Sequence, residues 1–202
     1  MNFIKTSVLL IFIATAAQAM NEPNTNESFF TKSQRFDKSG TELYASNLEL
    51  KHHKKFGVGL SVGGANGLLG LNSELNLDSE NALVIGLGAG PSYSSFNFLY
   101  KRNFESLYLS PYGKLGYSKW LSSSGSTLLA KDSDILRRVF SEKDLKNGKL
   151  EVDFLISSVG VEYNQLEGEL AGVNFYAEFV LMTELQKATI IPSGAVGITY
   201  FY

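Results

Sequence analysis

The sequence has no cysteine among its 202 residues. It therefore has no disulfide framework, no thiolate metal site and no cysteine for lipid attachment. Charged residues are also scarce, at 19 % against roughly 25 % in ordinary globular domains. The net charge of −2 lacks the basic excess of a nucleic-acid-binding protein, so no nucleic-acid partner is expected. Histidine is limited to His52 and His53, which leaves few positions for chemistry that needs a histidine base.

The sequence also lacks an apolar run of the roughly 20 residues that a transmembrane helix needs. One shorter run, Val8 to Ala17, follows Lys5 and leads into Ala17-Gln18-Ala19. A positive start, a short apolar core and a small-x-small site predict a secretory signal peptide over residues 1–19, cleaved after Ala19. The alternative is an uncleaved anchor, and the short core disfavours it.

Glycine, tyrosine and phenylalanine are abundant, with 19, 10 and 14 residues. From Phe56 onward, apolar residues alternate with small or polar ones, which indicates β-strands with two unlike faces. In residues 152–163 both parities are apolar, so the inward face of that strand stays open. Eight strands are predicted, over residues 56–64, 68–77, 83–90, 95–101, 106–118, 152–163, 173–184 and 194–202.

Most of the connections between these strands carry the Asn, Gly and Asp residues typical of tight turns. Such turns are predicted at Asn66-Gly67, Asp78 to Asn81, Arg102-Asn103 and Asn164 to Gly168. The fifth connection, residues 121–150, is long and polar. If both termini are periplasmic, the fifth connection and the seventh, residues 185–193, are extracellular, as expected for outer-membrane barrels with short periplasmic turns.

The alternating pattern allows a soluble sandwich, a lipocalin-like barrel or a transmembrane barrel. The minor face carries many glycines beside Asn, Glu and Lys, and glycine weakens a strand that shows it to water. Inside an eight-stranded barrel, whose interior is just wide enough for side chains, the same glycines would leave room for long side chains opposite. This favours a transmembrane barrel with a polar interior and a lipid-facing apolar surface.

The last strand alternates Val196, Ile198, Tyr200 and Tyr202 toward lipid and finishes on an aromatic residue. This ending resembles the β-signal of bacterial outer-membrane barrels, and the chain resembles the superfamily of small eight-stranded outer-membrane β-barrels. "GLLGLNSELNL" and "YNQLEGELAG" are similar to segments of uncharacterised outer-membrane proteins of Bdellovibrio-like bacteria. The resemblance implies an outer-membrane location, contact with membrane lipid and insertion by the barrel-assembly machinery through the C-terminal strand.

The predicted fold is therefore all-β, an eight-stranded antiparallel up-and-down transmembrane β-barrel. It covers residues 56–202 and follows a periplasmic extension over residues 20–55. Within that extension, "TELYASNLELK" could be an amphipathic helix or an additional strand. "KHHKK" (residues 51–55) predicts a basic collar facing lipid headgroups, because adjacent histidines on a strand point to opposite faces and make a metal site unfavourable. Aromatic girdle residues are expected at Phe56, Tyr100, Tyr117, Tyr163 and Tyr202.

Four charged residues fall on the predicted interior: Glu74, Lys101, Lys114 and Glu178. Because a buried charge without a partner is costly, we expect them to pair and to close the lumen to ions. The predicted function is a structural or surface-interaction barrel with no enzymatic activity, cofactor or metal. The alternatives are a narrow conduit for small apolar molecules and a lipid-modifying enzyme, although a lipid-modifying barrel would need a histidine base at the outer rim.

The long connection provides the expected contact with an extracellular partner. Ile135, Leu136, Val139 and Phe140 have helical spacing after Ser133. They could form a partner-binding surface or a lid over the barrel mouth. The alternative is that they pack against one another within the loop.

Overall fold

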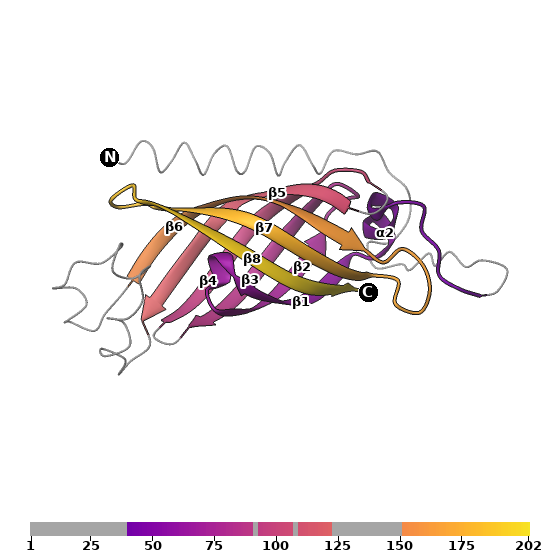
Figure 1. Ribbon diagram of the computed structural model, residues 1–202, viewed down its shortest axis with the longest axis horizontal. Coiled ribbons are helices and arrows are strands. Elements are labelled where there is room, and N and C mark those ends of the chain that lie inside the picture. Colours follow the sequence, from indigo (N-terminus) through magenta and orange to yellow (C-terminus); the bar gives the residue numbers. More distant parts are fainter. Residues whose placement is uncertain (1–39, 91–92, 107–108, 123–150) are drawn as a thin grey trace. The chain divides into compact units, whose positions relative to one another are not determined.

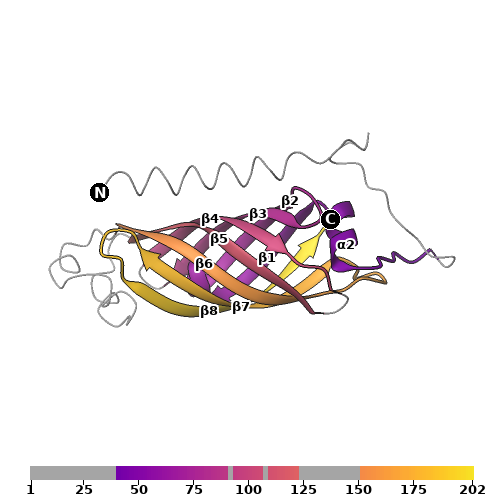
Figure 2. The same ribbon diagram turned by 90° about the horizontal axis from the view of Figure 1, so that it is seen from above.

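The computed structural model describes residues 40–90, 93–106, 109–122 and 151–202. Eight antiparallel strands follow one another around a closed barrel, and β8 pairs with β1 to complete it (Figures 1 and 2). The predicted fold class, an eight-stranded antiparallel up-and-down β-barrel, is confirmed. The strands are β1 (Phe56–Gly63), β2 (Leu69–Asn76), β3 (Asn81–Gly90), β4 (Tyr93–Asn103), β5 (Leu109–Ser122), β6 (Glu151–Asn164), β7 (Val173–Glu184) and β8 (Ile190–Phe201).

Two short helices flank β1. Helix α2 (Asn47–His53) precedes it and the 3-10 turn η1 (Gly64–Asn66) follows it, so they lie at opposite ends of the barrel, which we call the α2 end and the η1 end. Of the two alternatives for residues 41–51, the helix is the one observed, and only Leu43 pairs in an isolated bridge, with Glu167. No helix in the described part of the chain is long and apolar enough to cross a membrane.

Several predicted connections were wrong in their limits, since Asn81, Leu121 and Asn164 each belong to a strand. Arg102 pairs with Asn81 and Gly113 and so belongs to β4. β8 begins at Ile190, because Pro192 pairs with Leu181, and the seventh connection is correspondingly shorter than residues 185–193. A proline is tolerated there because β1 pairs with β8 only as far as Ala195, so the missing N–H lies on a free strand edge.

Side chains alternate strictly between the interior and the outer surface. The structure also shows which face of β6 points inward. Val152, Phe154 and Ile156 are buried on that face, and Glu162 is fully buried on it as well. Both parities of β6 are apolar because the interior is itself apolar toward the η1 end, where these three residues join one hydrophobic cluster. The sequence ambiguity therefore had a structural cause.

The outer surface carries a belt of large apolar side chains. Their exposure is high, for example 61 % for Leu60 and 65 % for Val159. Exposed ion pairs lie near both ends of the strands, Arg102 with Glu80 toward the α2 end and Lys119 with Glu151 toward the η1 end. Apolar residues from every strand contribute to the belt, among them Val62, Leu71, Leu87, Phe98, Leu115, Val161, Phe179 and Ile198.

Inward glycines make room for interior aromatic rings and for η1. A Cβ on Gly57 would lie 2.7 Å from the ring of Phe201, and one on Gly160 would lie 2.6 Å from the ring of Tyr112. A Cβ on Gly88 would overlap the backbone carbonyl of Asn66 in η1. The expectation that the glycines accommodate opposing side chains therefore describes only part of their role.

We expect Gly160→Ala to lower the free energy of unfolding by about 1–3 kcal/mol, the usual cost of overpacking. Its Cβ would crowd the Tyr112 ring and lie 2.7 Å from the Ala177 carbonyl oxygen. Gly113→Ala is the matched control, because the nearest atom to its Cβ would be the Ser158 oxygen at 3.8 Å. Unfolding of both variants in urea, in detergent micelles, is the measurement. Equal stability of the two variants would contradict the packing role of Gly160.

Candidate functional site

Helix α2 is fixed across the α2 end of the barrel. Ser46 caps it by accepting a bond from the Glu49 N–H at 3.3 Å, an arrangement that satisfies a free helix N–H. The Asn47 side chain donates to the Phe104 carbonyl at 3.1 Å and accepts from the Ser106 N–H at 2.9 Å. Asn47, Leu50 and Lys51 are fully buried, so one face of the helix points into the barrel.

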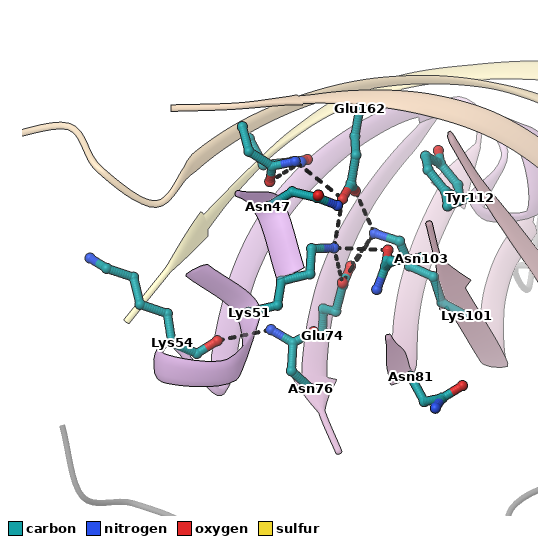
Figure 3. Close-up of polar contacts among 12 residues, drawn as sticks. Asn47, Lys51, Lys54, Glu74, Asn76, Asn81, Lys101, Asn103, Tyr112 and Glu162 are labelled. Atoms are coloured by element: carbon teal, nitrogen blue, oxygen red, sulfur yellow. Dashed lines mark hydrogen bonds and ion pairs between the residues drawn. The ribbon is translucent and has the colours of Figure 1, made fainter. Parts of the chain in front are cut away.

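A cluster of four charged side chains, the ion-pair tetrad, lies inside the barrel next to α2 (Figure 3). Lys51 Nζ from α2 lies 3.1 Å from Glu74 Oε1 and 2.7 Å from Glu162 Oε1. Lys101 Nζ lies 3.0 Å from Glu74 Oε2 and 2.7 Å from Glu162 Oε2. Two ammonium groups thus alternate with two carboxylates, and their side chains are at most 7 % exposed. The charges of the tetrad balance.

A second ion pair lies further along the lumen. Lys114 Nζ is 2.9 Å from Glu178 Oε2, and the Tyr112 hydroxyl donates to the same oxygen at 3.0 Å. The Lys114 ammonium also lies over the rings of Tyr112 and Tyr176, at 5.0 and 4.9 Å from their centroids, within range of a cation–π interaction. The centroid of the Tyr112 ring also lies 4.6 Å from Lys101 Nζ, so this ring stands between the pair and the tetrad.

The four charged residues expected inside, Glu74, Lys101, Lys114 and Glu178, thus fall into two groups. Sequence reasoning missed Glu162 and Lys51. The apolar pattern of β6 did not show which set of alternate residues points inward. The need of the interior lysines for a carboxylate partner was a possible signal that Glu162 lies inside. Lys51 was missed because a helix that enters the barrel mouth leaves no trace in strand periodicity.

Near the η1 end, η1 folds into the lumen. Asn66 Nδ2 donates to Ser61 and to Asn72 Oδ1, each at 2.7 Å, and its Oδ1 accepts from Asn97. The Ala65 carbonyl accepts from Trp120 Nε1 at 2.9 Å. The backbone of η1 can enter and leave this position because Gly63, Gly64 and Gly67 adopt φ of 86°, 64° and 83°, a region open chiefly to glycine.

An apolar cluster occupies the lumen around η1. Trp120 stacks on Tyr93 with ring centroids 4.3 Å apart and meets the Phe154 ring edge-on at 5.5 Å. The polar interior therefore gives way to a dry core toward the η1 end. The buried members are Ala65, Val84, Leu99, Trp120, Val152, Phe154, Ile156, Val180, Met182 and Ile191.

The expected basic collar at residues 51–55 was wrong for two of its lysines. Lys51 belongs to the tetrad, and Lys54 is buried, with Nζ 2.8 Å from the Ala171 carbonyl and 2.9 Å from Glu42 Oε2. Lys51 lies on the buried face of the helix, Lys54 follows the helix and also turns inward, and His52 is left exposed. No group of three His, Cys, Asp or Glu side chains suited to a metal ion occurs among the described residues.

Burial also changes the acidity of two groups near α2. The pKa of the Tyr44 phenol is raised to about 12, chiefly by burial and further by Glu42 and Glu49. Burial lowers the pKa of the Lys51 ammonium, while the charges of Glu162 and Glu74 oppose that shift. The two carboxylates therefore favour the charged form of Lys51.

The β8 residues predicted to face lipid, Val196, Ile198, Tyr200 and Tyr202, all lie on the outer surface with exposures of 38–56 %. Their inward neighbour Phe201 is fully buried and packs with Tyr44, Leu50 and Ala171. The Phe56 and Tyr202 rings stack at 6.4 Å where β1 meets β8. Ile135, Leu136, Val139 and Phe140 lie outside the described residues.

No protein-family model and no curated protein matches the sequence. Among solved structures, the N-terminal β-barrel domain of Pseudomonas aeruginosa OprF is similar, with a TM-score of 0.47 and 16 % identity over 71 % of this chain and 97 % of that one. The Yersinia pestis outer membrane protein Ail in a phospholipid bilayer nanodisc has a TM-score of 0.42 and 9 % identity, over 74 % of this chain and 99 % of that one. A crystal structure of Ail with the heparin analogue sucrose octasulfate has a TM-score of 0.39 and 12 % identity, over 73 % of this chain and 97 % of that one. Scores this low carry no argument about function, and the similarity to proteins of Bdellovibrio-like bacteria stays a prediction.

The tetrad predicts non-additive effects of charge removal. We expect Lys51→Met and Glu162→Gln each to lower the free energy of unfolding by about 3–5 kcal/mol, because each leaves an uncompensated buried charge. The double variant retains the balanced Lys101–Glu74 pair and should cost less than the sum of the single variants by about 0.5–3 kcal/mol. Urea unfolding followed by Trp120 fluorescence measures all three.

Glu80→Gln serves as the control, because its pair with Arg102 is exposed on both sides and should contribute at most about 1 kcal/mol. Strictly additive losses in the double variant would show that the four charges do not act as one cluster.

Proposed function

We propose that the chain is a β-barrel protein of the bacterial outer membrane whose lumen does not conduct ions. Its role is structural or one of surface interaction, through the segment that joins β5 to β6. The observation that carries this proposal is that both ends of the lumen are blocked by inward-folded elements, α2 with the tetrad at one end and η1 with its apolar cluster at the other.

The filled interior supports a closed lumen. Between the two blocked ends, the lumen holds the rings of Tyr112 and Tyr176 and the Lys114–Glu178 pair. An ion crossing the barrel would have to break the tetrad and then displace η1 from bonds to Ser61, Asn72 and Trp120. Each step uncovers buried polar groups, whose loss of partners is costly.

The belt on the outer surface supports a membrane location. On β5, large outward apolar side chains occur from Leu109 to Leu121, with Lys119 between them, which is long enough for the roughly 9–11 residues of a tilted membrane-spanning strand. Exposed aromatic residues such as Phe56, Tyr163 and Tyr202 gather toward the α2 end, as in an interfacial girdle. Membrane lipid is thus the proposed partner of the belt, and insertion by the barrel-assembly machinery through β8 follows from the same proposal.

The orientation follows from export and loop length. With a signal peptide removed at Ala19, the α2 end would face the periplasm and the β5–β6 connection would face outward. A filled barrel leaves the connections between its strands for contact with an extracellular partner, and the β5–β6 connection is the longest one between the described strands. The conduit alternative would require both α2 and η1 to leave the lumen. The enzyme alternative would require a histidine base, whereas His52 and His53 lie on α2, away from the η1 end.

A conductance measurement tests the closed lumen. Purified protein inserted in a planar lipid bilayer should give no steady current, because the tetrad and η1 block both ends. Folding of the barrel is verified independently, by the change in gel mobility between heated and unheated samples. A steady single-channel current from the natural sequence would favour the conduit alternative.

Labelling of intact cells tests the orientation. Because the chain has no cysteine, Ser126→Cys in the β5–β6 connection and Glu167→Cys in the β6–β7 turn each provide a single thiol. A membrane-impermeant maleimide should label the first on intact cells and the second only after the outer membrane is permeabilised. The reverse pattern would invert the proposed topology, and equal labelling of both would argue against membrane insertion.

A further inference from the structure

The Lys51 ammonium sits in a complete hydrogen-bonding site. Its three N–H groups face three oxygen acceptors, Glu162 Oε1 at 2.7 Å, Asn103 Oδ1 at 3.0 Å and Glu74 Oε1 at 3.1 Å. The ring of Phe201 lies 5.2 Å away and adds a cation–π contact. Figure 3 shows Lys51 reaching these groups from α2, whereas Glu74, Asn103 and Glu162 are supplied by the barrel wall.

The barrel wall holds these acceptors in place without help from Lys51. Asn103 Nδ2 donates to the Glu80 carbonyl at 3.1 Å, which turns its Oδ1 toward the site. Lys101 bonds both oxygens of Glu74 and one oxygen of Glu162, and Asn164 Nδ2 donates to the other Glu162 oxygen at 3.3 Å. The site is therefore preorganised by β2, β4 and β6.

Charge and geometry define the ligand class. Two carboxylates face the single Lys101 ammonium once Lys51 is left out of the count, so the wall carries one negative charge in excess. A primary ammonium supplies that charge together with three N–H donors. A quaternary ammonium supplies the charge without any N–H, and an alkali cation supplies it without an alkyl chain to pack near the Phe201 ring.

We infer that the α2 end of the barrel is a binding site for a primary alkylammonium group, which Lys51 occupies as a ligand built into the chain. The site belongs to the barrel wall, and the helix contributes only the ligand. Other amines of this class, such as a free alkylamine or a lysine side chain of another protein, can bind there when the Lys51 side chain is absent. The inference does not depend on the membrane location or on the conductance of the barrel.

Chemical rescue of a truncated lysine tests this inference. Lys51→Ala keeps a strong helix-forming residue in α2 and removes the atoms beyond Cβ, which together equal one n-propylammonium. The variant should lower the ratio of folded to unfolded protein by about 150-fold to 5000-fold, the change expected when a buried charge loses its partner. Addition of 100 mM n-propylammonium should restore about tenfold of that loss if it binds with a Kd of about 10 mM. The natural protein should change by less than about twofold, since its site is occupied.

The controls separate binding from general effects of salt. Tetramethylammonium and potassium at the same concentration should restore less than about twofold, because neither combines N–H donors with an apolar chain. Lys51→Met should show no rescue, because its side chain fills the space. Equal rescue by tetramethylammonium or potassium, rescue of Lys51→Met, or full stability of Lys51→Ala without amine would each overturn the inference.

A variant that does not fold is still informative. If Lys51→Ala forms no barrel on dilution from urea into detergent, the folded fraction on an unheated gel becomes the readout. The n-propylammonium ion should then raise that fraction, while tetramethylammonium should not. An unchanged folded fraction in the presence of the amine would overturn the inference.

Discussion

The pairing of buried charge inside a narrow closed barrel is the constraint on which the rest of this structure depends. Glu74 and Glu162 lie in the wall with almost no contact to solvent, and a lone buried carboxylate would be too costly to keep. The single positive charge of Lys101 cannot neutralise both carboxylates, and Lys51 of α2, which lies outside the sheet, supplies the second positive charge. The position of α2 follows from that requirement, and with it the burial of Leu50 against Phe201 and the blockage of one end.

At the η1 end the lumen is filled by the backbone turn η1, whereas at the α2 end it is filled by charged side chains. β1 and β2 have 8 residues each, whereas β5 and β6 have 14. The short hairpin leaves η1 below the rim, where glycines on β3 make room for it. Polar bonds from Asn66 and the indole of Trp120 then anchor the turn. Three kinds of group thus fill the barrel: ion pairs, aromatic rings packed against glycines, and the turn η1.

The strands of the barrel could be predicted from alternation because most of them have one apolar face and one face of small or polar residues. Interior placement of Glu74, Lys101, Lys114 and Glu178 follows from the same alternation. Alternation failed at Glu162, where an apolar interior at one end of β6 removed the contrast between faces. It could not place Lys51 or η1, since both depend on contacts between segments far apart in the chain. The collar at residues 51–55 was wrong because its composition was interpreted without knowing its secondary structure.

The assembly of the tetrad from non-neighbouring elements constrains the order of folding. Its members come from α2, β2, β4 and β6, and the barrel closes only when β1 meets β8, for example through Gly57 and Phe201. Contacts so distant along the chain give a high contact order, which slows folding because loop-closure entropy is lost before the contacts form. The Lys51 site and the Phe201 cluster do not exist in a half-formed sheet. We therefore expect α2 to dock late, after closure of the barrel, and the bonds that it adds to oppose reopening of the β1–β8 seam.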